Sequence, residues 1–207
     1  MVDLRKKFLF RMTHVRNIPH ILEFGITHVN SENRNENYAP IGDSSIINTR
    51  NTFILDDGSF LGEYIPFYFG PRMPMLYVIQ NGFNGVKCTH PKDIVYCVVS
   101  VQRVIDLNLF FRFTDGHAID MMSMFFDVHS INRLDEIVDY DAVNAKYWTD
   151  PSDLDKKRRK EAEFLIKGDV SKNAIVGFIV YNEETKNVVR SYGVPDRKVI
   201  VKREYYF

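Results

Sequence analysis

The run DIVYCVVSVQRVI at residues 93–105 constrains the fold more than any other segment of this chain. Its β-branched and aromatic residues follow one another almost without interruption, as in a strand that is buried on both faces. Such a strand must be covered by other elements, and a chain of 207 residues is long enough to build the sizeable core that this requires. We therefore expect residues 93–105 to form a buried central strand.

The remaining elements are expected from hydrophobic periodicity and from turn residues. Further strands are predicted over 8–15, 63–70, 162–166, 174–181 and 198–207. Helices are predicted over 17–26, 71–82, 121–128, 134–148 and 182–193, and a long loop over 30–45. These elements show no regular βα repeat and no glycine-rich loop after a strand, which favours an α+β fold over a Rossmann or P-loop fold.

Composition excludes several classes of protein. The 27 basic residues balance 27 acidic ones, which argues against a protein that binds nucleic acid through bulk positive charge, although a locally basic groove stays possible. No repeat or linker divides the sequence, so one domain over 1–207 is expected.

The cysteines and the hydropathy pattern bear on the compartment. Cys88 and Cys97 lack the spacing of a zinc site, and unpaired cysteines suit a reducing cytoplasm. Because no apolar leader or window of ~18–20 residues is present, we expect a cytoplasmic protein without membrane spans.

Signatures of several enzyme classes are missing. The chain contains no GxSxG, HExxH or GxxxxGK[ST] motif, so serine hydrolases, zincins and P-loop enzymes are not indicated. The polar residues that remain as candidates are Arg11, Thr13, Arg50, Tyr68, Arg72, His117 and Glu163. Considered one at a time, the arginines are most simply interpreted as solvated surface charges. His117 is as well explained by a structural role, as a hydrogen-bonded and partly buried histidine, as by a catalytic one.

Glu163 and the basic run KKRRK at 156–160 leave two interpretations each open. Glu163 stands among apolar residues, and a carboxylate on a half-buried strand face costs free energy unless it is paired. It therefore either has an arginine partner or has a chemical role. The basic run is either a solvated helix face or a contact for phosphates.

Five segments together resemble the DarT family of DNA ADP-ribosyltransferase toxins. In chain order they are FRMTHVRNIPHILEFGI from residue 10, IGDSSIINTR ending at Arg50, YIPFYFGPRMPMLY at 64–77, FRFTDGHA at 111–118, and YWTDP with KEAEFLI within 147–166. The similarity runs from about residue 8 to Phe207, which is nearly the whole chain.

The resemblance implies an ADP-ribosyltransferase fold, described as a split β-sandwich of two sheets with peripheral helices and a NAD⁺ cleft between them. It implies transfer of ADP-ribose from the co-substrate NAD⁺ to a base of single-stranded DNA, with release of nicotinamide and without a metal. Thymidine is the favoured acceptor and guanosine the next. It also implies a partner antitoxin of the ADP-ribosylglycohydrolase type.

The resemblance assigns roles to individual residues. It makes Glu163 and Arg50 catalytic, places NAD⁺ contacts at Arg11, Thr13, Asn17 and Tyr68, and puts His117 on the substrate side. Many relatives carry histidine where this chain has Arg11. The segment 147–160 corresponds to the loop that recognises the target. From charge and position we further predict DNA contacts at Arg72, Trp148, Lys156, Lys157, Arg158, Arg159 and Lys160.

Two alternatives remain. The triplet Glu161-Ala162-Glu163 resembles the ExE pattern of arginine-modifying transferases, so the acceptor is alternatively protein, RNA or, in a NAD⁺ glycohydrolase, water. The basic and aromatic residues of 147–160 favour DNA over these. The other alternative is a non-catalytic nucleic-acid-binding module, which would predict loss of Glu163 or Arg50. Both are present, and zero net charge also weighs against binding as the sole purpose.

Overall fold

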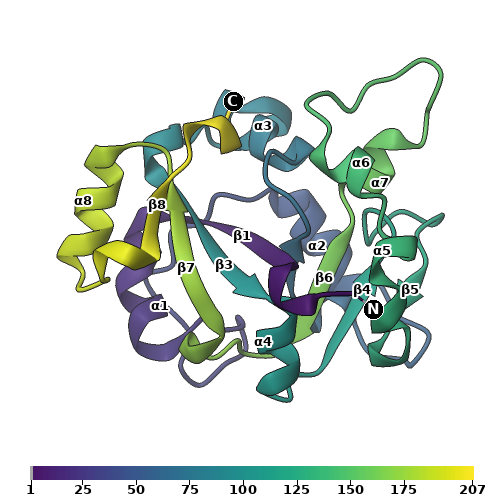
Figure 1. Cartoon of the computed structure of the whole chain (residues 1–207), viewed down its shortest axis with the longest axis horizontal. Coiled ribbons are helices and arrows are strands. Elements are labelled where there is room, and N and C mark those ends of the chain that lie inside the picture. The colour runs from purple at the N-terminus through teal and green to yellow at the C-terminus, as the bar shows by residue number, and fades with distance from the viewer. Residues whose placement is uncertain (1) are drawn as a thin grey trace.

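The computed structural model describes residues 2–207 and contains an eight-stranded sheet with helices around it, which is the expected α+β class (Figure 1). The strands are β1 (Phe8–His14), β2 (Tyr64–Tyr68), β3 (Ile94–Ser100), β4 (Phe111–Thr114), β5 (Phe125–Phe126), β6 (Glu163–Lys167), β7 (Ile175–Val180) and β8 (Val199–Val201). The helices are α1 (Ile18–Phe24), α2 (Ser44–Thr52), α3 (Pro74–Asn81), α4 (Val101–Asp106), α5 (Leu134–Ile137), α6 (Tyr140–Asn144), α7 (Lys156–Lys160) and α8 (Glu183–Ser191).

The strand order is β5-β4-β6-β2-β1-β3-β7-β8, and only β7 and β8 pair in parallel. Every residue of β3 is buried, as the sequence predicted for a central strand. The strand is shorter than expected, because the Ser100 hydroxyl accepts a hydrogen bond from the Arg103 amide at 3.3 Å and caps α4. The prediction is therefore confirmed up to Ser100 and wrong for residues 101–105.

The middle of the sheet is its weakest junction. Strands β1 and β2 are paired at one position, Phe10 opposite Tyr68, whereas β1 pairs with β3 over seven positions. The halves β5-β4-β6-β2 and β1-β3-β7-β8 thus meet at a single residue pair within one hydrogen-bonded sheet. The expected separation into two sheets is not confirmed, because the eight strands form one sheet.

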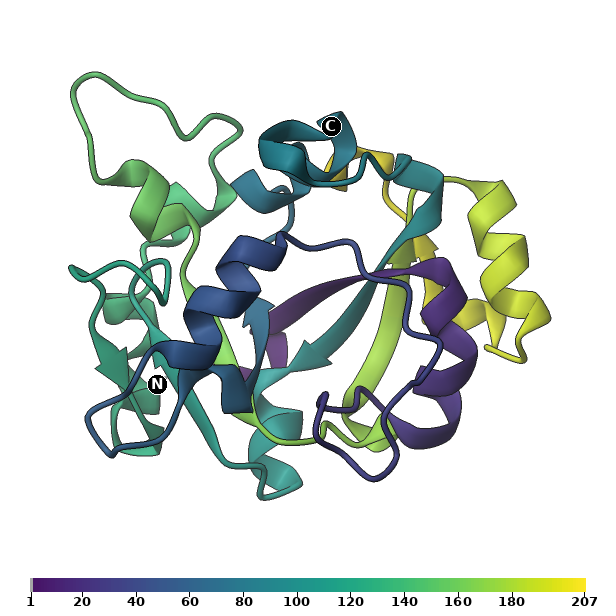
Figure 2. The same ribbon diagram turned by 180° about the vertical axis from the view of Figure 1, so that it is seen from behind.

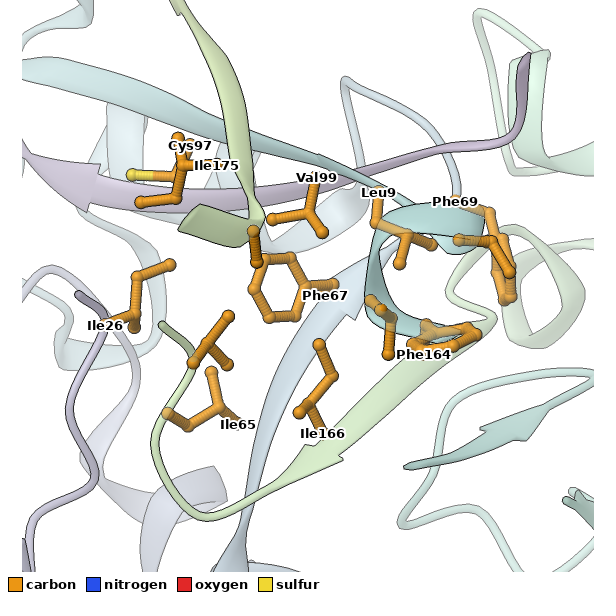
Figure 3. Packing of buried hydrophobic residues seen from close by; sticks show 14 of the residues in the cluster. Leu9, Ile26, Ile65, Phe67, Phe69, Cys97, Val99, Phe164, Ile166 and Ile175 are labelled. Atoms are coloured by element: carbon orange, nitrogen blue, oxygen red, sulfur yellow. The ribbon is translucent and has the colours of Figure 1, made fainter. Parts of the chain in front are cut away.

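Aromatic stacking fixes the first of these halves. Phe164 on β6 is fully buried and stacks on Phe111 of β4 with 4.7 Å between ring centroids, while Phe69 meets it edge-on at 6.0 Å (Figure 3). Figure 3 also shows Phe67 of β2 and Ile166 of β6 packed beside this group. The packing of Phe164 also fixes the backbone of the candidate residue Glu163, which directly precedes it on β6.

Helix α1 ends as the sequence predicts. Gly25 has φ of +88°, a conformation that favours glycine, and a Cβ there would lie 2.3 Å from the carbonyl oxygen of Val170. The main chain of Ile26 forms an isolated bridge with Val170, so the close approach is used to tie the end of α1 to the segment after β6. From there the chain runs as a long loop to α2, which crosses the face of the sheet seen in Figure 2.

Helix α8 was also predicted, and Asn182 caps it. The Asn182 Oδ1 accepts hydrogen bonds from the amide of Thr185 at 2.8 Å and from its hydroxyl at 2.9 Å. Replacing Asn182 with alanine removes the cap and is expected to lower the free energy of unfolding by about 1 kcal/mol. Thermal unfolding followed by circular dichroism measures the change. An unaltered midpoint would show that packing alone sets the start of the helix.

Three predicted segments differ from the structure. Residues 121–128 were expected to be helical, but they form turns, strand β5 and the start of a 3₁₀ helix at Val128. Residues 134–148 form two short helices, α5 and α6, because the chain turns at Val138 and Asp139 caps the second helix. The predicted strand over 198–207 continues only to Val201. Helix α2 was not predicted; the expected loop at 30–45 gives way to it at Ser44.

No helix within residues 2–207 has the length and apolar character needed to cross a membrane.

Candidate active site

Three distant parts of the chain meet at the carboxylate of Glu163, the first residue of β6. Its Oε2 accepts a hydrogen bond from Nη1 of Arg50 at 2.8 Å, and its Oε1 accepts one from the backbone amide of Ala118 at 2.9 Å. Glu163 itself is 0% exposed and Arg50 is 8% exposed. The arginine partner that the sequence left open for Glu163 is present, and it comes from 113 residues away.

The turn after β4 brings the second donor to Glu163. The Thr114 hydroxyl donates to the carbonyl oxygen of Gly116 at 2.6 Å and accepts from the Glu163 amide at 3.0 Å. This folds the chain back so that the amide of Ala118 points at the carboxylate. The neighbouring imidazole of His117 lies with its Nε2 3.8 Å from Glu163 Oε1. The histidine is therefore close to the carboxylate without replacing either donor.

Arg50 is presented by α2, whose N-terminus is capped by Asp43 through the amide of Ser45 at 2.8 Å. Arg50 is the one buried residue of α2, so this helix contributes little to the core and a charged side chain to the site. The Nη1 of Arg50 donates a hydrogen bond to Glu163, while its Nη2 is buried without a hydrogen-bond partner among the described residues. A buried guanidinium nitrogen without a partner is a donor that a ligand can satisfy.

A cavity of about 430 Å³ lies between β1 and β2 on the side covered by α2. Six of the residues predicted for the site line it, namely Arg11, Thr13, Asn17, Arg50, Tyr68 and His117. Glu163 is sealed from solvent, and two of its neighbours, Arg50 and His117, form part of the cavity wall. The volume falls within the range usual for small-molecule and cofactor sites.

Asn17 and Arg11 are both partly occupied by contacts within the protein. The Asn17 side chain donates to Thr13 Oγ1 and to the carbonyl of Ala39, each at 2.9 Å, and accepts from the amide of Ala39 at 2.8 Å. It thereby fixes the long loop over the cavity. Arg11 donates through Nη1 to the carbonyl oxygen of Pro66 at 3.0 Å, across the gap between β1 and β2.

Tyr68 and Glu161 complete the electrostatic surroundings. Burial raises the pKa of the Tyr68 hydroxyl above its ordinary value, and the carboxylates of Glu163 and Glu161 raise it further, so this group is a neutral phenol at physiological pH. Burial also raises the pKa of Glu161, against the lowering effect of His117. The cavity wall therefore carries the neutral hydroxyl of Tyr68, while the carboxyl groups of Glu161 and Glu163 act on it from outside the lining.

Arg72 and Trp148, which were predicted to contact DNA, lie in a different cluster. The Arg72 guanidinium lies 4.5 Å from the centre of the Phe207 ring, and Trp148 packs edge-on against Phe207 and Tyr77. Neither residue lines the cavity. They form an aromatic surface beside α3, separate from the group around Glu163.

The predicted basic run is mostly engaged by carboxylates. Lys156 pairs with Asp150 at 3.2 Å, and Arg159 contacts Asp139, Asp153 and Asp155. Arg158 contacts Asp115 and Asp155. Lys157 is exposed and has no ion pair within residues 2–207. Of the charges expected to follow a phosphate backbone, this lysine alone is both exposed and unpaired in the described chain.

Lys160 is buried and serves a different purpose. Its Nζ donates hydrogen bonds to the carbonyl oxygens of Val143 and Ala145, each at 2.8 Å. These contacts join the C-terminal end of α7 to the end of α6. Burial, with a further contribution from the charge of Arg72, lowers the pKa of Lys160 from 10.5 to about 8. The ammonium form is therefore disfavoured in the folded state relative to the unfolded chain.

This shift predicts a pH dependence of stability. Between about pH 8 and 10.5 the unfolded chain binds more protons at Lys160 than the folded one, so stability should rise with pH in this window. We expect the free energy of unfolding of the native protein to increase relative to that of Lys160→Met between pH 7.5 and 10. Urea denaturation at both pH values measures the difference. A constant difference would contradict the shift.

Sequence reasoning did not identify the Ala118 amide, the Thr114 hydroxyl or the contact between Asn17 and Ala39. The first is a backbone donor and carries no residue-type signal. The other two are polar groups whose partners depend on tertiary contacts. No cluster of three or more His, Cys, Asp or Glu side chains in the described part of the chain could hold a metal ion.

Comparison with known proteins places these features in a family. The model of the family "ssDNA thymidine ADP-ribosyltransferase, DarT" matches residues 10–207. A DNA ADP-ribosyl transferase of Escherichia coli O127:H6 is 34% identical over 185 residues, which are 88% of this chain and 84% of that protein. A DNA ADP-ribosyl transferase–glycohydrolase fusion protein of Thermosipho africanus is 29% identical over 92% of this chain and 48% of its own length.

Solved structures agree. Thermus sp. 2.9 DarT in complex with ADP-ribosylated single-stranded DNA superposes with a TM-score of 0.81 at 27% identity, over 97% of this chain and 96% of that chain. The same protein in complex with NAD⁺ gives a TM-score of 0.76 at 26% identity, over 97% and 98%. With matches over nearly its whole length in sequence and in structure, the chain belongs to the DarT family of NAD⁺-dependent single-stranded DNA ADP-ribosyltransferases.

Proposed function

We propose that this protein is a toxin that transfers ADP-ribose from NAD⁺ to thymidine in single-stranded DNA, with Glu163 and Arg50 as its catalytic residues. The observation that carries the proposal is the buried pair of Glu163 and Arg50, which lie 2.8 Å apart, with Arg50 in the wall of a ligand-sized cavity. A sealed carboxylate held by two donors is costly to build for stability alone. We infer that its purpose is chemical.

The carboxylate suits the bond that must break. Loss of nicotinamide from NAD⁺ leaves positive charge developing on the ribose carbon, and a fixed negative group stabilises that charge most where water is excluded. Glu163 is fully buried and held in place by Arg50 and the Ala118 amide. Because these contacts are already formed, little reorganisation is needed when the charge develops.

Proton removal from the base has two candidates. Thymine loses a proton when its ring nitrogen attacks the ribose, and a general base must lie within hydrogen-bond reach of it. His117 is at the cavity wall, 3.8 Å from Glu163, and we assign it to the substrate side as the sequence suggested. Glu163 itself is the other candidate, once the substrate has displaced one of its donors.

The residues on β1, β2 and α2 suit a dinucleotide. The unpartnered Nη2 of Arg50 and the guanidinium of Arg11 are donors for oxygens of the diphosphate or ribose. Thr13 and Asn17 shape the wall beneath the long loop, and the neutral phenol of Tyr68 offers a surface for the nicotinamide. No metal is needed for this chemistry, since the charge is handled by side chains.

Single-stranded DNA is the acceptor that best fits a recessed carboxylate. A base stacked in a duplex would first have to be extruded, whereas an unpaired base reaches a pocket at lower cost. The fusion of a transferase with a DNA ADP-ribosyl glycohydrolase in Thermosipho africanus supports a glycohydrolase antitoxin as partner. Both described cysteines are unpaired thiols, and we propose a cytoplasmic site of action.

The acceptor class is tested by comparing possible acceptors in parallel reactions. The protein is incubated with labelled NAD⁺ and, in separate reactions, with equal nucleotide concentrations of single-stranded DNA, duplex DNA, RNA or cell protein. The proposal predicts label on single-stranded DNA well above the others. Label on protein or RNA would favour the acceptors suggested by Glu161-Ala162-Glu163, and free ADP-ribose alone would indicate a NAD⁺ glycohydrolase.

Lys157 supplies a prediction about DNA affinity. A lysine that neutralises one phosphate releases about 0.7 counterions from a single strand. Lys157→Gln is therefore expected to reduce the slope of log affinity against log salt by roughly 0.7. Fluorescence anisotropy with a labelled oligonucleotide measures it. Lys198→Gln, at an exposed lysine next to β8 at the far edge of the sheet, is the matched control and should leave the slope unchanged.

A further inference from the structure

We propose that Arg158 is a positioning residue that holds the loop 115–124 against Glu163, and that it is not a contact for DNA phosphates. The proposal rests on the transferase function proposed above, since it concerns the geometry of that site. It also revises the expectation from sequence, in which Arg158 belonged to a basic run that follows the strand.

The guanidinium of Arg158 is fully engaged. Its Nε and Nη2 donate to the two carboxylate oxygens of Asp155 at 2.7 and 2.9 Å. Its Nη1 donates to Asp115 Oδ1 at 3.0 Å and to Ser123 Oγ at 3.2 Å. All three nitrogens thus have partners, and the side chain is only 11% exposed. A phosphate would have to displace the carboxylate of Asp155, which already binds in bidentate geometry, or that of Asp115.

Two of these partners belong to the loop 115–124. Asp115 Oδ1 also accepts from the amide of Met124 at 2.8 Å, so one carboxylate joins both ends of the loop. The main chain adds a further link, because the carbonyl oxygen of Arg158 accepts from the amide of His117 at 3.0 Å. Arg158 therefore binds the loop 115–124 through hydrogen bonds of both its side chain and its backbone.

Gly116 shows how closely the Arg158 side chain approaches the backbone of this loop. A Cβ on Gly116 would lie 2.4 Å from Nη1 and 2.8 Å from Cγ of Arg158. The arginine side chain consequently lies directly on the loop backbone, which only a residue without a side chain allows at this distance. The packing restrains the one turn of chain that precedes His117 and Ala118.

These two residues are the loop's contacts with the carboxylate. The Ala118 amide donates to Glu163 Oε1, and His117 Nε2 lies 3.8 Å from the same oxygen. If the loop moves outward, Glu163 loses one of its two donors and the histidine moves with it. Displacement of a catalytic group by about 1 Å costs on the order of 100-fold in rate.

Arg159 is a matched control. It stands next to Arg158 on α7 and is also ion-paired, but its partners are Asp139, Asp153 and Asp155, none of which lies in the loop 115–124. Replacing either arginine with glutamine removes one positive charge from the same helix. A phosphate-tracking role predicts similar effects for the two variants, whereas the positioning role predicts a difference.

The experiment compares Arg158→Gln, Arg159→Gln and the unchanged chain by hydrogen–deuterium exchange and by kinetics. We expect peptides spanning 115–124 to exchange faster in Arg158→Gln only. We also expect kcat for transfer to fall about 10- to 100-fold further in Arg158→Gln than in Arg159→Gln, with KM for NAD⁺ and the salt slope of DNA binding unchanged. Asp115→Asn weakens the same link and should reproduce the exchange result if Arg158→Gln fails to fold.

Unchanged exchange of 115–124 together with a salt slope reduced by about 0.7 would overturn the proposal and restore the phosphate role. Equal effects of the two arginine variants on kcat would overturn it as well. If the unchanged chain transfers no ADP-ribose, the proposed function fails, while the exchange comparison still decides whether Arg158 holds the loop.

Discussion

Replacing Glu163 with glutamine is expected to lower kcat for ADP-ribose transfer by about 1,000-fold or more. Glutamine has nearly the same shape, so the cavity is retained. It lacks the negative charge that offsets positive charge on the ribose, and it offers one acceptor oxygen where the carboxylate offers two. The donors at Arg50 Nη1 and the Ala118 amide therefore cannot both be satisfied.

The measurement is the rate at which an oligonucleotide gains the mass of ADP-ribose. NAD⁺ binding, followed by calorimetry, serves as the control and should change far less than kcat, because the cavity wall is preserved. Stability should fall by about 3–5 kcal/mol, because the buried guanidinium of Arg50 is left without its counter-charge. A variant that binds NAD⁺ and keeps more than a tenth of the native rate would remove Glu163 from the catalytic role.

Replacing Arg50 with methionine is expected to reduce both stability and activity. Methionine fills similar space but leaves the Glu163 carboxylate buried with the Ala118 amide as its remaining donor. Breaking a buried ion pair in this way costs about 3–5 kcal/mol. Activity should fall about 100- to 1,000-fold, since the carboxylate is no longer held and the free Nη2 is lost. Urea denaturation and the transfer assay measure the two effects.

A double variant separates the ion pair from general packing. Arg50→Met combined with Glu163→Gln removes the uncompensated charge, so it should be more stable than Arg50→Met alone. If instead the two stability losses simply add, the side chains do not interact energetically, and the 2.8 Å contact would not be the reason why α2 is held against the sheet.

The sequence predicted the sheet better than the surrounding helices. Strand β3 and helix α8 carry clear periodicity and boundary residues, and both were found. Helix α2 was missed because SSIINTRNT has no apolar face; it is held by its cap and by Arg50. Residues 121–128 have helical spacing in sequence, but Phe125 and Phe126 pair with β4, so tertiary contacts decide the outcome.

The site could be predicted residue by residue only through resemblance. From its neighbours in the sequence, Glu163 was expected to have either an arginine partner or a chemical role, and the structure shows the arginine partner. The contacts of the basic run could not be predicted, because Asp115 and Asp139 lie far from α7 in sequence and approach it only in the fold. A run of like charges in sequence thus became a set of internal ion pairs, with Lys157 left free in the described chain.

The most direct test of the proposed function is to incubate the protein with NAD⁺ and single-stranded oligonucleotides that each lack one of the four bases, and to record their masses. The proposed function predicts the gain of one or more ADP-ribose units on every oligonucleotide except the one without thymidine, and no gain with Glu163→Gln. Modification that persists without thymidine and disappears without guanosine would contradict the proposed acceptor. Consumption of NAD⁺ with no gain on any oligonucleotide would contradict transfer to DNA.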